Sequence, residues 1–595
     1  YNTGHLFGFF SVFNADAIKS VTLHKGNMPA QYGGRLSSVL DFHMKDGNYK
    51  KYQATGGIGL ISSRLTLEGP IVKDKGSFIV SGRRTYIDII SKPFVESNGV
   101  KGVPYFFYDL NIKANYKIGL KDQLFFSSYI GRDQVKLGLL DGRLQSNIFW
   151  GNKTGTLKWN HRFSSKLNMN VSAIYNDYNF VSKATFDNFD TQVDSRITDR
   201  TLKVAYDYYP GIRHKIQFGF LYTFHTFTPR RAAGSASGVT FNGTSNPEKY
   251  AQDAAIYLSD QYTISEKLDV AVGIRLNTFR QVGPYSFITN SPRDTTTFSK
   301  GQPIVTFLNP EPRVGIRYKL NSTSSLKAAY NLNNQYIHQV SLSGNALPFD
   351  IWVASSKLIK PQRASQYSIG YFRNLFENSF EFSIEAYYKN LTNQIEYRQD
   401  YVPRVSGEIE NEFVFGRGKS YGLEFFLNKK AGKFQGWIGY TLAKATRKFE
   451  KINGGKEFSA KYDRRHDINI IGTYVLNEKW TIGGTFVFAS GQPITIPERR
   501  YLVEGVIYNQ YGLRNSYRMQ DYHRLDLSAT YSKKRPNRRL ESSWTFAVYN
   551  VYNRKNPYIY FIDADGNPIS GELVVKAKKM FLFPILPSIT WNFKF

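Results

Sequence analysis

The densest group of side chains suited to ligand binding lies in one predicted loop near the C-terminal end of the chain. Basic and aromatic residues occur together there, namely Arg499, Arg500, Tyr501, Tyr508, Tyr511, Arg514, Tyr517 and Arg518. Guanidinium groups bind carboxylates and phosphates through paired hydrogen bonds, and aromatic rings attract cations. The loop could therefore bind a sugar, an anionic chelate or a peptide. The favoured alternative is that the loop packs against its neighbours.

Residue patterns typical of enzymes are absent from the sequence. The chain has no Cys, and its nine His are scattered without metal-ligand spacing. There is no phosphate-binding glycine loop and no nucleophile elbow. Residues Asp563–Asn567 weakly resemble a calcium loop, but the remaining ligands and the terminal Glu are missing. We therefore expect binding without catalysis, and no cofactor or resident metal.

The formal net charge of +31 indicates a polyanionic partner. Basic residues are spread over the whole length, which disfavours nucleic acid. The clearest cluster lies at a predicted turn and comprises Lys533, Lys534, Arg535, Arg538 and Arg539. An anionic lipid surface, such as the phosphates of lipopolysaccharide, fits this distribution better. Lipopolysaccharide is also an alternative partner for the arginine- and tyrosine-rich loop.

Alternating apolar and polar residues predict membrane-facing strands. In the last strand Ile589, Trp591, Phe593 and Phe595 alternate with polar residues. Aromatic residues make up 16% of the chain, as expected where aromatic girdles meet lipid headgroups. No run of about 18 uncharged apolar residues is present, so no transmembrane helix is predicted.

Short polar turns alternate with longer segments along the chain. The turns are predicted near residues 71–76, 119–122, 163–166, 209–213, 264–267, 319–324, 374–378, 428–433, 476–479 and 534–538. These hairpins, a strand near 50–59 and the C-terminal strand predict an all-β fold, a 22-stranded antiparallel transmembrane β-barrel over residues 50–595. Closure is required because unpaired backbone groups are not tolerated in lipid. A lumen of this width needs a plug.

Residues 1–49 do not fit the barrel pattern. A short strand at Ala17–Gly26 leads into the turn Pro29–Gly33, and related motifs follow at Asn309–Gly315, Ser420–Glu424 and Tyr462–Asp467. In this order the motifs resemble TonB-dependent outer-membrane receptors. The resemblance implies that residues 1–49 are the C-terminal part of a plug domain inside the lumen. The family's TonB-contacting segment and early plug strands are absent from the sequence, so we expect the TonB complex to act through an N-terminal portion that precedes Tyr1, and we find no signal peptide.

In that family, cations of the plug pair with carboxylates of the barrel wall. Glu385 and Glu424 each lie between apolar, outward-facing neighbours, so alternation places both in the lumen. Lys25 and Arg35 of the predicted plug could meet them and hold the plug in place. The alternative is that both glutamates face lumen water with local partners.

Two functions from different classes follow from this resemblance. The first is active import across the outer membrane of a Gram-negative bacterium, with substrate bound by the outer loops and plug and energy supplied by the TonB complex. The second is a structural or accessory barrel subunit of a larger outer-membrane complex, partnered by surface lipoproteins or other subunits. A passive porin is disfavoured because the plug would block the lumen. The sequence does not identify a substrate.

Overall fold

The computed structural model describes residues 1–595 except 2–3, 6–7, 91–104, 140–143, 187–188, 237–238, 243–246, 289–294, 342–349, 400, 402–408, 504–505, 534–538 and 566–573. The N-terminal segment contains β1 (Gly4–His5), β2 (Phe10–Ser11), a 3-10 turn (Ala15–Ala17), β3 (Ile18–His24) and β4 (Val39–Met44). No helix in these described ranges is long and apolar enough to cross a membrane.

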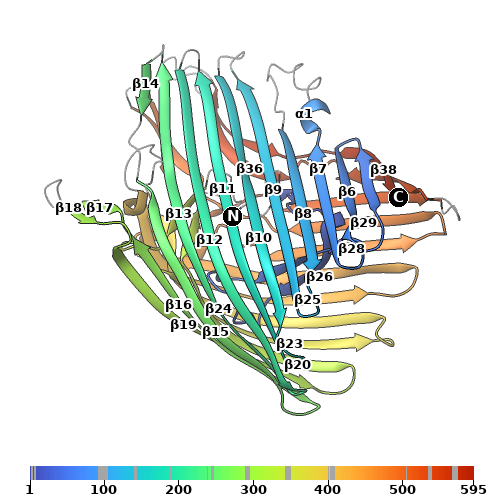
Figure 1. The fold of residues 1–595 in the computed structure, drawn as a ribbon. Coiled ribbons are helices and arrows are strands. Elements are labelled where there is room, and N and C mark those ends of the chain that lie inside the picture. The colour runs from blue at the N-terminus through green and yellow to red at the C-terminus, as the bar shows by residue number, and fades with distance from the viewer. Residues whose placement is uncertain are drawn as a thin grey trace.

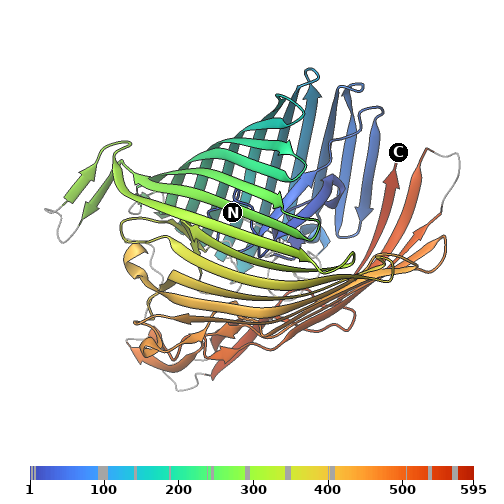
Figure 2. The same cartoon turned by 90° about the horizontal axis from the view of Figure 1, so that it is seen from below.

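The rest of the chain forms one closed antiparallel barrel (Figures 1 and 2). Its 22 strands are β5 (Gln53–Gly59), β6 (Ser62–Val72), β7 (Gly76–Thr85), β8 (Tyr105–Lys117), β9 (Asp122–Leu139), β10 (Leu144–Arg162), β11 (Leu167–Phe186), β12 (Phe189–Gly211), β13 (His214–Ala236), β15 (Lys249–Thr263), β16 (Leu268–Val282), β19 (Pro303–Lys319), β20 (Ser324–Gln335), β23 (Gln362–Leu375), β24 (Phe380–Tyr397), β25 (Phe413–Lys429), β26 (Phe434–Lys448), β28 (His466–Val475), β29 (Trp480–Ala489), β34 (Tyr522–Ser532), β35 (Glu541–Tyr549) and β38 (Leu586–Lys594). The predicted fold class and strand number are confirmed.

The longer connections carry small elements of their own. These are α1 (Ile87–Ile90), β14 (Val239–Asn242), β17 (Tyr285–Ile288), β18 (Thr295–Phe298), β21 (Ile337–Val340), β22 (Ile351–Ala354), β27 (Phe458–Ser459), β30 (Pro493–Ile494), β31 (Pro497–Val503), β32 (Val506–Tyr511), β33 (Tyr517–Arg518), β36 (Pro557–Asp565), β37 (Val574–Phe581) and two 3-10 turns, Ile409–Glu412 and Asn453–Gly455. The short predicted turns all fall between strands that pair with each other, and the turn at 534–538 lies outside the described residues.

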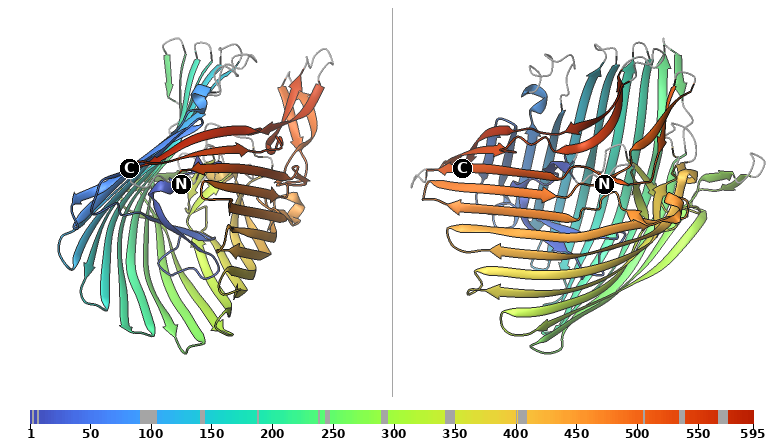
Figure 3. Two further views of the ribbon diagram at one scale, coloured as in Figure 1. Left: turned by 90° about the vertical axis from the view of Figure 1, so that its right-hand side faces the viewer. Right: turned by 180° about the vertical axis from the view of Figure 1, so that it is seen from behind.

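Side-chain alternation explains why these segments form barrel strands. On β15, Ile256 and Leu258 are more than half exposed on the outer surface, whereas Ala255 and Tyr257 are buried towards the lumen. Strand length is very uneven: β12 and β13 have 23 residues each, and β38 has 9. One side of the wall is therefore much taller than the other, as Figures 1 and 3 show.

The N-terminal segment lies inside the ring of strands (Figure 2, dark blue). β3 and β4 form a two-stranded sheet. The segment contacts β6 through the ion pair of Asp16 with Arg64, 2.8 Å apart. It contacts β8 through Lys113, whose Nζ donates to the carbonyl oxygen of Met44 at 2.9 Å. The barrel then begins at β5, and a domain boundary between residues 49 and 50 stays a prediction.

Candidate functional site in the barrel lumen

The turn between β3 and β4 is held by a buried arginine of β16. Arg275 is only 4% exposed and donates to the carbonyl oxygens of Ala30 and Gln31 at 3.4 and 3.2 Å. Asn277 accepts a third hydrogen bond from Arg275 at 2.7 Å. Gly33 lies directly against this side chain, and a Cβ there would overlap it, 2.9 Å from Cδ. The glycine is therefore required for the close approach of the turn to the wall.

A second buried arginine, on β19, holds the same turn. Arg313 is 2% exposed and donates to the carbonyl oxygens of Met28 and Pro29, the first at 3.4 Å. Its charge is balanced by Glu311, which is fully buried 2.8 Å away and also accepts from the backbone N–H of Asn334 at 2.9 Å. We call the contacts of Arg275 and Arg313 with residues 28–31 the arginine anchor.

The arginine anchor was not predicted. The motif Asn309–Gly315 contains Glu311 and Arg313, but nothing in it states that the arginine binds backbone carbonyls of a turn far away in the sequence. The available signal is that Glu311 and Arg313 lie two residues apart on one face of a strand, which places both charges in the lumen. Buried charges there require partners.

Beside the anchor, the chain turns at a glycine that touches the wall. Gly26 has φ +73°, a conformation that L side chains rarely adopt. A Cβ at this position would lie 2.9 Å from Oγ of Ser368 on β23. The close approach places the neighbouring Lys25 against strands β24 and β25.

Lys25 lies between two glutamates of the barrel wall. Its Nζ is 2.9 Å from Oε1 of Glu385 and forms a second ion pair and hydrogen bond with Glu424. The two glutamates face each other directly on β24 and β25. Two carboxylates at this spacing repel each other without a cation between them. We call these three residues the lysine latch.

The latch is in contact with water. The side chain of Lys25 is 40% exposed, and those of Glu385 and Glu424 are 20% and 29% exposed. Burial lowers the pKa of Lys25, but the hydrogen bonds and charges of Glu424 and Glu385 more than offset this, so its pKa lies above the usual value. Lys25 is therefore cationic at neutral pH.

Arg35 is placed elsewhere. Its Nη1 donates to the carbonyl oxygen of Gly34 at 3.1 Å, and its guanidinium lies over the ring of Trp352 on β22, 5.9 Å from the centroid. None of the ion pairs within the described ranges joins Arg35 to Glu385 or Glu424. The structure thus brings together three of the four predicted residues.

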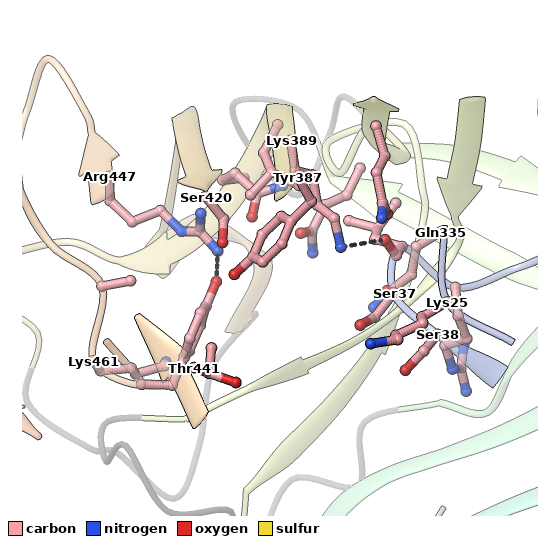
Figure 4. A pocket seen from close by; sticks show the side chains of 18 of the residues that line it. Lys25, Ser37, Ser38, Gln335, Tyr387, Lys389, Ser420, Thr441, Arg447 and Lys461 are labelled. Carbon is pink, nitrogen blue, oxygen red and sulfur yellow. Dashed lines mark hydrogen bonds between the residues drawn. The ribbon is translucent and has the colours of Figure 1, made fainter. Parts of the chain in front are cut away.

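A cavity of about 750 Å³ opens above the latch towards the long loops. Figure 4 shows Lys25, Ser37 and Ser38 of the N-terminal segment on one side and Arg447 and Lys461 on the other, with wall residues of β24 and β25 between them. Its charged lining residues are Lys25, Arg35, Lys389, Arg447, Lys461, Glu385, Glu396 and Glu424. Cations outnumber carboxylates, so this outer cavity attracts anions.

Two arginines of the predicted binding loop are held by contacts with other parts of the chain. Arg514 is 3.5 Å from Glu396 and donates to the carbonyl oxygens of Tyr397 and Arg398 at 3.3 and 3.0 Å. Arg518 pairs with the buried Asp463 and donates to the carbonyl oxygen of Gly491 at 3.0 Å. These two side chains hold the loops together, as the packing alternative predicts.

Other residues of that loop face outwards. Arg499, Tyr501, Tyr511 and Tyr517 are exposed. Arg500 and Tyr508 lie on β31 and β32, and their side chains are outside the described set. The weak calcium pattern also runs into residues that are not described. Within the described ranges, no group of three or more His, Cys, Asp or Glu residues could hold a metal ion.

The fold and the filled lumen define the class: a closed antiparallel β-barrel with a segment of its own chain inside the lumen. Residues 81–553 match the family model "TonB dependent receptor-like, beta-barrel". Because this match covers well over half of the chain, the protein belongs to that family, whose members are receptors and transporters.

Solved structures with the same fold include several iron-uptake receptors. The FrpB iron transporter from Neisseria meningitidis has a TM-score of 0.66 and 13% identity, covering 100% of this chain and 90% of its own. The ferric yersiniabactin uptake receptor FyuA from Yersinia pestis has a TM-score of 0.67 and 11% identity, with 97% and 85% covered. The ferric citrate transporter FecA gives 0.66 and 13%, with 98% and 85% covered. At these identities the likeness shows the fold alone, and no curated protein matches the sequence.

Proposed function

We propose that this protein imports a small anionic substrate across the outer membrane of a Gram-negative bacterium, using energy delivered by the TonB complex. The observation that carries the proposal is an N-terminal segment held inside the barrel by two kinds of contact, with a cationic cavity left open towards the long loops. A filled lumen excludes free diffusion, so passage requires the segment to move.

The substrate first meets the outer loops and the outer cavity. The exposed residues Arg499, Tyr501, Tyr511 and Tyr517 form the outer contact, or alternatively contact lipopolysaccharide. Lys389, Arg447 and Lys461 line the cavity below. Guanidinium and ammonium groups with aromatic rings suit a carboxylate-bearing or catecholate chelate. No bond of the substrate is broken, because the protein supplies binding and a path only.

The TonB complex acts from the periplasm, on a segment that precedes Tyr1. A pull transmitted to residues 1–49 breaks the lysine latch, because its ion pairs are hydrated and each costs little to separate. The cavity then opens towards the periplasm. Ferric chelates are the first substrates to test, since the FecA and FyuA structures are of ferric citrate and ferric yersiniabactin receptors.

Uptake of radioactive iron as ferric citrate and as mixed siderophores tests the proposal. Cells that carry the full-length gene should accumulate iron, and cells that lack either the gene or the TonB complex should not. A protein that binds no chelate and supports no TonB-dependent uptake, yet co-purifies with other outer-membrane subunits, would be an accessory subunit instead.

A further inference from the structure

A second lumen cavity, of about 790 Å³, lies on the short-turn side of the barrel. It is lined by the turn between β12 and β13, residues 211–215, and by lumen residues of β16, β19, β20 and β23. The outer cavity is instead lined by loop residues such as Phe458 and Asn515. The two cavities therefore open towards opposite rims of the barrel.

The two cavities meet at the lysine latch. Both are lined by Leu23, Lys25, Gly26, Ser368 and Glu385, whereas Glu424 lines the outer cavity alone. Lys25 and its two carboxylates thus stand between one cavity and the other.

Positive charge predominates on both sides of the latch. The charged lining residues of the inner cavity, His excluded, are Lys25, Arg213, Lys215, Arg317, Lys327, Asp269 and Glu385. As in the outer cavity, cations outnumber carboxylates. A charged lining of one sign concentrates solutes of the opposite sign.

Two lysines of the wall flank the latch. Lys389 lines the outer cavity and donates to the carbonyl oxygen of Leu36 at 3.2 Å. Lys327 lines the inner cavity and lies over the ring of Phe372, 4.0 Å from the centroid. In the described part of the chain, neither lysine forms an ion pair within 4 Å of a carboxylate.

Each latch carboxylate shares a cavity with one of these lysines. Lys327 and Glu385 both line the inner cavity, and Lys389 and Glu424 both line the outer cavity. The strand register places Gly370 between Lys327 and Glu385. A Cβ at Gly370 would lie 2.8 Å from Cγ of Glu385, so the missing side chain leaves space for the glutamate to lie over β23, towards Lys327.

We propose that the two cavities are one route for a small anionic solute and that the lysine latch is its gate. When Lys25 withdraws, Lys327 and Lys389 neutralise the glutamates, so the opened route keeps its positive charge. This inference rests on the proposed import function and adds a route that does not require the whole N-terminal segment to leave the barrel.

The test is conductance of the purified full-length protein in a planar lipid bilayer with KCl. Lys25→Met should raise the single-channel open probability about tenfold or more, because two partly hydrated ion pairs shift a two-state equilibrium by roughly that factor. Lys25→Arg should stay closed. Lys19→Met is the matched control, since Lys19 is exposed on β3, the strand that ends directly before Lys25, and takes no part in the latch.

A KCl gradient then measures selectivity. The Lys25→Met pore should pass chloride in preference to potassium, and adding Lys327→Met and Lys389→Met should lower that preference at least about twofold, as expected when focusing charges are removed. A Lys25→Met protein that stays closed, or that prefers potassium, overturns the proposal. Heat-modifiable electrophoresis confirms that each variant is folded.

A second experiment tests the proposal if Lys25→Met folds poorly. It restores the positive charge at residue 25 chemically, after the protein has folded. Residues 1–595 contain no Cys, so Lys25→Cys introduces the single thiol of this part of the protein. A cationic methanethiosulfonate reagent should close the Lys25→Cys pore, and an anionic one should leave it open. Equal effects of both reagents contradict a charge gate. The bilayer contains no TonB, so this result is independent of the uptake experiment that tests the import function.

Discussion

Two neighbouring contacts between the N-terminal segment and the barrel wall differ in their exposure to water. In the arginine anchor, the barrel provides the cations, and Arg275 and Arg313 are 4% and 2% exposed. In the lysine latch, the segment provides the cation, and Lys25 is 40% exposed. Water can replace a partner in the latch but cannot reach the anchor, so the two contacts differ in the work needed to break them. Separating the latch therefore takes less work than separating the anchor.

The largest expected effect comes from Arg313→Ala. Glu311 would lose its ion-pair partner at a fully buried site, and breaking a buried pair in this way costs about 3–5 kcal/mol. Urea unfolding of the folded barrel, with hydrogen exchange at residues 28–36, measures the loss. The control is Arg317→Ala on the same strand, whose side chain is 49% exposed and 3.9 Å from Asp269; its cost should stay within about 1 kcal/mol. Equal losses of stability for Arg313→Ala and Arg317→Ala would show that the buried pair of the anchor is no harder to break than an exposed ion pair.

A smaller effect is expected for Gly33→Ala. The new methyl group would overlap Arg275, whose place is fixed by its hydrogen bonds, and such overpacking costs about 1–3 kcal/mol. Hydrogen exchange at residues 28–36 should become faster while the barrel strands stay protected. Gly155→Ala serves as the control because its Cβ would meet nothing within 4 Å. Unchanged exchange in Gly33→Ala would show that the turn does not depend on Arg275.

Glu424→Gln should change stability by no more than about 1 kcal/mol, because its ion pair is partly hydrated. It should nevertheless loosen the segment, since Lys25 keeps only Glu385. Passage of small antibiotics into cells, or conductance in a bilayer, measures the loosening, and the double variant with Glu385→Gln should show more of it. Unchanged passage in both the single and the double variant would mean that the latch does not hold the N-terminal segment in place.

The smallest effect is expected from pH. The folded-state pKa of Lys25 lies above its usual value of 10.5, so the latch contributes fully below that pH and is lost only as pH rises through the folded pKa. A spin label on Ser20→Cys should therefore show no change in mobility as the pH is raised from neutral to near 10.5. An increase in the mobility of the label between neutral pH and pH 10.5 would show that Lys25 is not held by the two carboxylates.

The barrel was predictable because its signals are local. Alternation along each strand and short polar turns between strands can be read within about ten residues, and alternation alone placed Glu385 and Glu424 in the lumen. Lys25 was singled out through the family motif. The contacts of Arg35 were harder to predict, because Trp352 belongs to a loop hairpin whose position no local pattern specifies.

The arginine anchor could not be predicted from the sequence, and the reason is chemical. Arg275 and Arg313 bind backbone carbonyls, which every residue has, so no partner side chain marks the contact. Arg514 and Arg518 were predicted as candidate binding residues, but their partners also lie outside the local sequence. They suggest ligand binding in a loop read by itself, but Glu396 and Asp463, which lie far away in the sequence, accept their hydrogen bonds and charge.

The uneven wall gives the barrel a slanted mouth. A tilted strand needs about 9–11 residues to cross a bilayer, so the 9 residues of β38 suffice, whereas about half of β12, with 23 residues, is surplus. The neighbouring strands β13 and β15 are aligned at the short turns, where His214 pairs with Tyr262, so the surplus lies at the end that carries the long connections. On the low side, formed by the shorter strands β28, β29, β34, β35 and β38, the loop hairpins β31–β32 and β36–β37 stand above the strands (Figure 3). The mouth is therefore made by barrel strands on its high side, at β10–β13, and by loop hairpins on the other.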